Sequence, residues 1–174
     1  MSSYRTPLFV LALLYLVFFG LLVWSKNQLP AQVATHFNAA GRADGWMSSA
    51  QHLRFMILFG LGFPWFVPVL CYFGRFLPPW CWNLPHKDLW LAPELRPILF
   101  RYLLRHSLWF ACFALGFVIG IGWSIVQANQ PSQPRLSPSV AFAVIGPFLL
   151  ATLLWAVRLL RFLNRVPKPQ LWIP

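Results

Sequence analysis

The chain has 174 residues, of which 59% are hydrophobic and only 10% are charged, with 14 Lys and Arg against 3 Asp and Glu. A soluble domain carries about 25% charged residues, so this composition excludes a soluble enzyme, an acidic binding module and a disordered tail. The formal charge of +11 would indicate nucleic-acid binding only if the basic residues shared one solvated face, and long uncharged runs separate them here. We therefore compare the charge pattern with a lipid bilayer and expect no nucleic-acid partner.

Four uncharged runs are long enough to cross a bilayer. A span needs about 20 mainly apolar residues, and its backbone groups must be satisfied within the segment, which favours helices over strands. The sequence therefore predicts an all-α membrane protein, a single membrane domain (1–174) with four transmembrane helices at 7–24, 55–74, 107–128 and 136–157. The intervening segments are an outer loop at 25–54, a cytoplasmic loop at 75–106, an outer loop at 129–135 and a cytoplasmic tail at 158–174.

The first run could also be a cleaved signal peptide. Its apolar stretch is longer than the 7–15 residues usual for such a peptide, and the segment 25–30 lacks the small-residue pattern of a cleavage site. We therefore expect it to be retained as the first helix. Prolines at 64, 68 and 147 should kink the second and fourth helices, and Gly116 and Gly120 have the spacing of a close helix contact.

Lys and Arg in short loops set the orientation of a membrane protein. With the N-terminus inside, the cytoplasmic segments hold ten of the 14 basic residues: Arg5, Arg75, Lys87, Arg96, Arg101, Arg105, Arg158, Arg161, Arg165 and Lys168. The outer segments hold the other four: Lys26, Arg42, Arg54 and Arg135. The count predicts that both termini are cytoplasmic.

The first outer loop has the pattern of a small folded cap. Val33, Thr35 and Phe37 alternate with smaller or polar residues, which is typical of a strand. The segment 38–41 is rich in turn residues, and Asp44-Gly45 is a second turn signal. We expect a short β-hairpin here, followed by a serine cap at 48 or 49 on the next helix.

The same loop resembles a known domain. The residues that carry the resemblance are Pro30, Thr35-His36-Phe37-Asn38, Gly41 and Asp44-Gly45-Trp46, in the motif 29–46. With its flanking helices, the segment of about 7–75 is similar to the DUF1648 domain, which also occurs in the longer SdpI-like immunity proteins. The family often has Lys soon after the aromatic residue, where this chain has Ser48-Ser49-Ala50. The resemblance implies an integral protein of the bacterial cytoplasmic (inner) membrane, with a role in envelope signalling, regulation or toxin immunity.

The outer-loop residues that we expect to matter are His36, Asn38, Gly41, Asp44, Gly45 and Trp46. The interpretation that we favour is structural: His36 and Asp44 order the loop and Trp46 anchors it at the interface. A metal site formed by His36, Asp44 and His52 is the sharper alternative, since imidazole and carboxylate suit zinc. A pocket for a peptide or lipid is a third alternative.

A second motif lies in the cytoplasmic loop, at Asn83, Pro85, Lys87, Asp88 and Trp90, and similar stretches occur in proteins of this kind. We interpret it as an interfacial segment with aromatic anchors and solvated charges, with a headgroup or partner site as the alternative.

All three acidic residues lie outside the predicted spans, which counts against ion-coupled transport and acid–base catalysis within the membrane. We therefore predict a non-enzymatic membrane protein without cofactor, metal or catalytic residues, with a protein or peptide partner at the outer face. A small transporter or permease-like component is the alternative, a metal-dependent membrane enzyme stays open, and so does oligomerisation.

Overall fold

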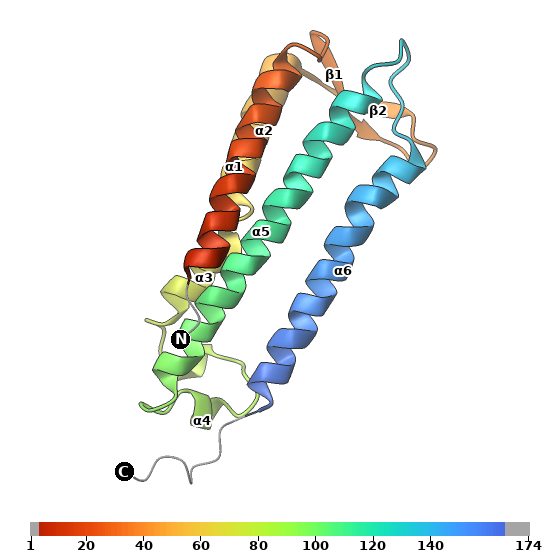
Figure 1. The fold of residues 1–174 in the computed structure, drawn as a ribbon. Coiled ribbons are helices and arrows are strands. Elements are labelled where there is room, and N and C mark those ends of the chain that lie inside the picture. The colour runs from red at the N-terminus through yellow and green to blue at the C-terminus, as the bar shows by residue number, and fades with distance from the viewer. Residues whose placement is uncertain (1–3, 166–174) are drawn as a thin grey trace.

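The computed structural model describes residues 4–165 and confirms the expected fold class. Four helical segments are long and apolar enough to cross a membrane, and they run up and down the molecule in turn (Figure 1). The elements are α1 (Arg5–Lys26), β1 (Gln32–Phe37), β2 (Ala43–Ser48), α2 (Ser49–Gly62), α3 (Phe66–Gly74), a 3₁₀ turn η1 (Pro79–Cys81), α4 (Lys87–Trp90), α5 (Arg96–Ala128) and α6 (Pro138–Leu163). The end with β1 and β2 is called the hairpin end, and the opposite end is called the α4 end.

The helices extend beyond the uncharged runs that predicted them. α5 begins at Arg96 rather than at 107, and α6 ends at Leu163 rather than at 157. A charged residue ends an apolar run but not a helix, because Arg and Leu are both good helix formers. α2 begins at Ser49 rather than at 55, because Ser48 and Gln51 form a capping box: the Ser48 hydroxyl accepts from the Gln51 N–H, and the Gln51 side chain accepts from the Ser48 N–H. Of the expected cytoplasmic tail, residues 166–174 lie outside the described part.

Pro64 divides the second span into two helices, α2 and α3. Proline has no N–H, so the carbonyl of Gly60, four residues earlier, loses its helical donor. The Tyr15 hydroxyl of α1 donates to this carbonyl at 3.1 Å. A polar group of α1 thus satisfies the backbone where α2 ends, as the absence of water from a bilayer requires. The expected effect of Pro64 is confirmed. α6 continues as a helix through Pro147, and the kink expected there stays a prediction.

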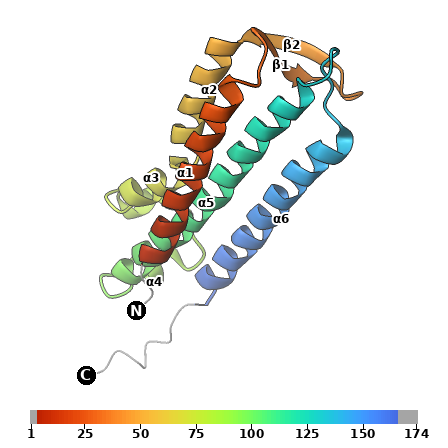
Figure 2. The same cartoon turned by 45° about the horizontal axis from the view of Figure 1, so that its top comes forward.

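α5 is the central helix of the bundle. It lies between the α1–α2 pair and α6 (Figures 1 and 2). A first apolar cluster joins α1, α2 and α5 and contains Leu11, Phe18, Leu22, Met56, Ala111, Cys112, Leu115 and Val118. A second cluster lies at the α4 end and contains Trp90, Leu95, Leu99, Phe100, Leu103 and Leu163. α6 is held from one side, and among its residues only Leu163 is buried.

Glycine contacts between helices differ from the expected pair. A Cβ on Gly120 would lie 2.9 Å from a methyl carbon of Val144 in α6, so this glycine permits a close approach of α5 and α6. A Cβ on Gly116 would meet no atom within 4 Å. The predicted contact is therefore right for Gly120 and wrong for Gly116.

Candidate functional site

The predicted hairpin forms at one end of the bundle, where β1 and β2 pair antiparallel. Its register pairs Gln32 with Ser48 and Ala34 with Trp46. Val33 is fully buried, and Ala34 on the other face is fully buried too. The turn expected at Asp44-Gly45 is wrong, because both residues lie within β2. The hairpin has a single reversal, between 37 and 43.

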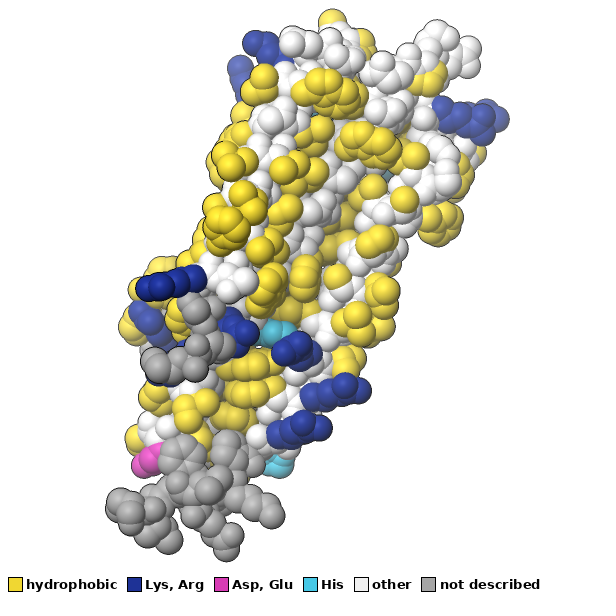
Figure 3. All heavy atoms as spheres, viewed as in Figure 1, with side chains coloured by type: hydrophobic (Ala, Val, Ile, Leu, Met, Phe, Trp, Pro, Cys, Tyr) yellow, Lys and Arg dark blue, Asp and Glu magenta, His cyan; other side chains and the backbone are white. Residues whose placement is uncertain are grey.

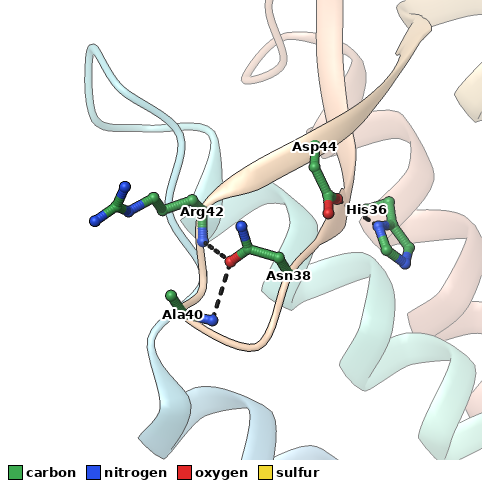
Figure 4. Close-up of polar contacts among 5 residues, drawn as sticks. All are labelled: His36, Asn38, Ala40, Arg42 and Asp44. Atoms are coloured by element: carbon green, nitrogen blue, oxygen red, sulfur yellow. Dashed lines mark hydrogen bonds and ion pairs between the residues drawn. The ribbon is translucent and has the colours of Figure 1, made fainter.

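Asn38 organises that reversal. Its side-chain oxygen accepts hydrogen bonds from the N–H groups of Ala40 at 3.0 Å and Arg42 at 3.1 Å (Figure 4). The backbone N–H of Asn38 donates to the Arg42 carbonyl at 2.9 Å, and the Gly41 N–H donates to the Asn38 carbonyl at 2.8 Å. Asn38 is therefore a turn residue whose side-chain oxygen takes the place of a backbone acceptor.

Gly41 is required by its conformation and by its neighbour. Its φ is +73°, in the left-handed region that glycine adopts readily. Its carbonyl accepts from the Leu136 N–H at 3.0 Å, and a Cβ at this position would overlap the Leu136 carbonyl oxygen. Next to it, Arg42 forms an isolated antiparallel bridge with Arg135. The turn is thus docked on the connection between α5 and α6.

His36 and Asp44 are brought together as predicted. Nδ1 of His36 and Oδ1 of Asp44 form a hydrogen-bonded ion pair across the two strands (Figure 4). The pair is open to solvent, with side chains 75% and 41% exposed, so it contributes little stability by itself. Gly45 lies opposite His36, where a Cβ would lie only 2.7 Å from the His36 Cβ. Glycine at 45 therefore leaves the space that His36 needs to reach Asp44.

Asn129, at the end of α5, is the residue that the sequence motifs missed. It is buried, its side-chain oxygen accepts from the Ala34 N–H at 2.9 Å, and its amide nitrogen donates to the Ala34 carbonyl at 2.9 Å. The same nitrogen donates to the Ile125 carbonyl at 2.8 Å. The Asn129 side chain therefore bonds β1 as the backbone of a neighbouring strand would, and it also caps the end of α5. Its position directly after an apolar run is typical of a helix cap and was the available signal.

The pairing of Ala34 shows which edge of the hairpin is open. Because both backbone groups of Ala34 bond Asn129, they point away from β2, so Ala34 and Trp46 form a non-hydrogen-bonded pair. The N–H and carbonyl of Trp46 then point away from β1, toward the outer edge of β2. Within residues 4–165 no backbone partner is found for them. The Trp46 side chain is 51% exposed, so this edge presents an unpaired backbone beside a large aromatic ring.

The structure separates the third residue of the proposed metal site from the other two. His52 lies in α2 and is 6% exposed, whereas His36 and Asp44 lie on the exposed hairpin. Among the described residues there is no group of three His, Cys, Asp or Glu close enough to hold a metal ion. The interpretation of these three residues as one metal centre is therefore wrong.

The second motif lies at the α4 end, far from the hairpin. Trp90 is 1% exposed, stacks on Phe162 at 4.9 Å and donates through its indole N–H to the Leu163 carbonyl at 2.8 Å. Its expected role as a surface anchor is wrong, because it is a buried member of the second apolar cluster. The polar members of the motif, Asn83 and Asp88, are exposed, and Lys87 and Pro85 are half-buried.

Comparison with known proteins bears on the first part of the chain. Residues 10–61 match the family model of DUF1648, a domain of unknown function. The match spans most of α1, the hairpin and most of α2, and so contains every outer-loop motif residue. No curated protein and no solved structure matches the chain.

Proposed function

We propose that this multi-pass membrane protein is a non-enzymatic recognition component of the bacterial cytoplasmic membrane, with the hairpin at the outer face and both termini inside. The motif residues support this, because Asn38, Gly41, Asp44 and Gly45 each have a role in shaping the hairpin. A domain whose motif is used to build one exposed surface element is suited to present that element to a partner. Envelope signalling, regulation or toxin immunity would use such recognition.

The open edge of β2 is the observation that carries the proposal. An edge strand with unpaired backbone groups binds an extended segment of another protein by adding it as a further strand, and side chains beside the edge give specificity. Trp46 supplies both parts, because its backbone groups point outward and its ring is exposed. The partner is therefore an extended peptide segment that pairs with β2 and packs an apolar side chain on the indole.

The opposite edge of the hairpin supports a signalling role. Asn129 ties β1 to the end of α5, and Gly41 ties the turn to the chain just before α6. These contacts connect the hairpin with two spans to which it is not joined in sequence. A partner that shifted the hairpin on binding would therefore change its contacts with the end of α5 and with the chain just before α6.

A proline at position 46 tests this mode of binding. The Trp46 N–H points away from β1, so Trp46→Pro removes no bond of the hairpin but blocks the addition of a strand at its outer edge. We expect this variant to lose complementation of a deletion strain challenged with membrane-active peptide toxins, while its thermal unfolding in detergent stays unchanged. Trp46→Tyr keeps both the backbone donor and an aromatic ring and should complement.

Full complementation by Trp46→Pro would contradict strand addition. If Trp46→Pro fails to complement because it is unfolded, its thermal unfolding will show this. Trp46→Thr keeps the N–H but lacks the ring, so it separates the contribution of the backbone donor from that of the aromatic ring. The transporter component and a relation to the SdpI-like immunity proteins stay predictions of the sequence.

A further inference from the structure

A groove lies between α5 and α6 near the α4 end. Its volume is about 870 Å³, and it is open on one side. Its polar part is formed by Arg105 of α5 and by Arg158 and Arg161 of α6. Figure 3 shows Lys and Arg side chains gathered at the two ends of the molecule, while the middle of this face is apolar.

These three arginines lack acidic partners within the part of the chain that the structure describes. Over residues 4–165 the one ion pair, His36 with Asp44, lies at the hairpin end. The guanidinium groups therefore present uncompensated positive charge at the mouth of the groove. Arginine binds phosphate well, because its planar group donates several hydrogen bonds in a fixed arrangement.

The wall of the groove is a rigid aromatic stack. The His106 ring lies 4.8 Å from the Trp155 ring and 5.2 Å from the Tyr102 ring, nearly parallel to both. His106 Nε2 lies 3.0 Å from the Trp155 carbonyl oxygen, and the Trp155 indole N–H donates to the His106 carbonyl at 2.9 Å. These reciprocal bonds hold α5 and α6 at a fixed spacing, so the groove is a formed feature of the fold.

The groove continues from its charged mouth into an apolar part. Trp109, Phe113, Ala151 and Leu154 also line it, and all lie further along the helices toward the middle of the bundle. At about 1.5 Å per helical residue, Phe113 lies about 12 Å beyond Arg105 along α5. A ligand that fits therefore has an anionic head and an apolar body of at least that length.

We propose that this groove binds an anionic phospholipid, with its phosphate at Arg105, Arg158 and Arg161 and an acyl chain along Trp109 and Phe113. Basic pockets between transmembrane helices bind anionic headgroups in this way. A soluble phosphate ester would use the mouth alone and leave the apolar part unfilled. The bound lipid covers the side of α5 and α6 where α6 has no other helix against it.

Native mass spectrometry of the detergent-purified full chain tests the proposal. We expect phosphatidylglycerol to bind and phosphatidylcholine to bind at least about tenfold more weakly, a difference of about 1.4 kcal/mol. Arg158→Gln with Arg161→Gln should weaken phosphatidylglycerol binding by a similar factor. The matched control is Arg42→Gln with Arg135→Gln, which removes the same charge at the hairpin end and should leave binding unchanged.

Two further arms identify the ligand. Excess inorganic phosphate should not displace the lipid, and Ala151→Phe, which fills the apolar part, should weaken phosphatidylglycerol binding while thermal unfolding stays near that of the parent protein. Equal binding of the two lipids, or equal loss in both double variants, would overturn the site. Displacement by phosphate would overturn the lipid in favour of a soluble anion.

Discussion

At the scale of single residues, Asn129 at the end of α5 is the side chain that holds β1 of the hairpin from outside. Asn129→Ala leaves the buried N–H and carbonyl of Ala34 without partners, and each such group costs about 1–3 kcal/mol. We expect a marked loss of thermal stability and faster hydrogen exchange of the Ala34 amide. Asn164→Ala is the matched control, since Asn164 also caps a helix but is exposed, and it should cost much less.

Asn129→Asp sharpens that test. An aspartate keeps the acceptor for the Ala34 N–H but loses the amide that donates to the carbonyls of Ala34 and Ile125. It should therefore fail to restore stability. Rescue by Asp would show that the carbonyl bonds are unimportant and would contradict the role of Asn129 as a substitute strand.

Tyr15 makes a second prediction at this scale. Tyr15→Phe removes the donor to the Gly60 carbonyl that Pro64 leaves unpaired, and hydrogen bonds between transmembrane helices contribute about 0.6–1.7 kcal/mol. In a Pro64→Ala background the residue at 64 has an N–H of its own, so the same change should cost less. A double-mutant cycle from unfolding in detergent measures the coupling, and additive effects would contradict it.

At the scale of elements, the contact between α1 and α2 depends on a glycine. A Cβ on Gly60 would overlap the ring of Phe18, which is fully buried and has no room to move aside. Gly60→Ala should therefore destabilise the protein by about 1–3 kcal/mol, the usual cost of overpacking. Gly62→Ala, two residues away in the same helix, meets no atom within 4 Å and should be tolerated. Thermal unfolding of both variants in detergent tests this prediction. Equal stability of the Gly60→Ala and Gly62→Ala variants would contradict the close packing of Gly60 on Phe18.

The sequence predicted elements whose signals are local. The four spans follow from uncharged length, and the hairpin follows from the alternation before Asn38 and the turn residues after it. What it did not predict depends on contacts between distant parts of the chain. Asn129 bonds Ala34 across 95 positions, and Trp90 bonds Leu163 across 73. The residues next to Asn129 and Trp90 in the sequence do not indicate these distant partners. The sequence alone therefore favours an ordinary loop asparagine and a surface tryptophan.

At the scale of the whole molecule, the hairpin and the α4 segment lie at opposite ends of four helices that are long and apolar enough to cross a membrane (Figure 1). The distribution of Lys and Arg predicts which side is which, because basic segments stay in the cytoplasm. The proposal for the hairpin depends on this orientation, and the proposal for the lipid groove agrees with it. The hairpin can meet a partner outside the cell only if it is external, and the arginine groove can meet the anionic cytoplasmic leaflet only if it is internal.

Cysteine labelling tests the orientation with a residue that the chain already has. Cys81 is exposed in η1 near the α4 end, whereas Cys71 is half-buried and Cys112 is buried. With Cys71 and Cys112 changed to Ala, Cys81 should react with a membrane-impermeant maleimide only after spheroplasts are permeabilised. In a chain that carries Ala39→Cys at the exposed hairpin tip and Cys81→Ala, the new thiol should react in intact spheroplasts. The reverse pattern would place the hairpin inside and remove the basis for recognition at the outer face, because the open edge of β2 would then face the cytoplasm.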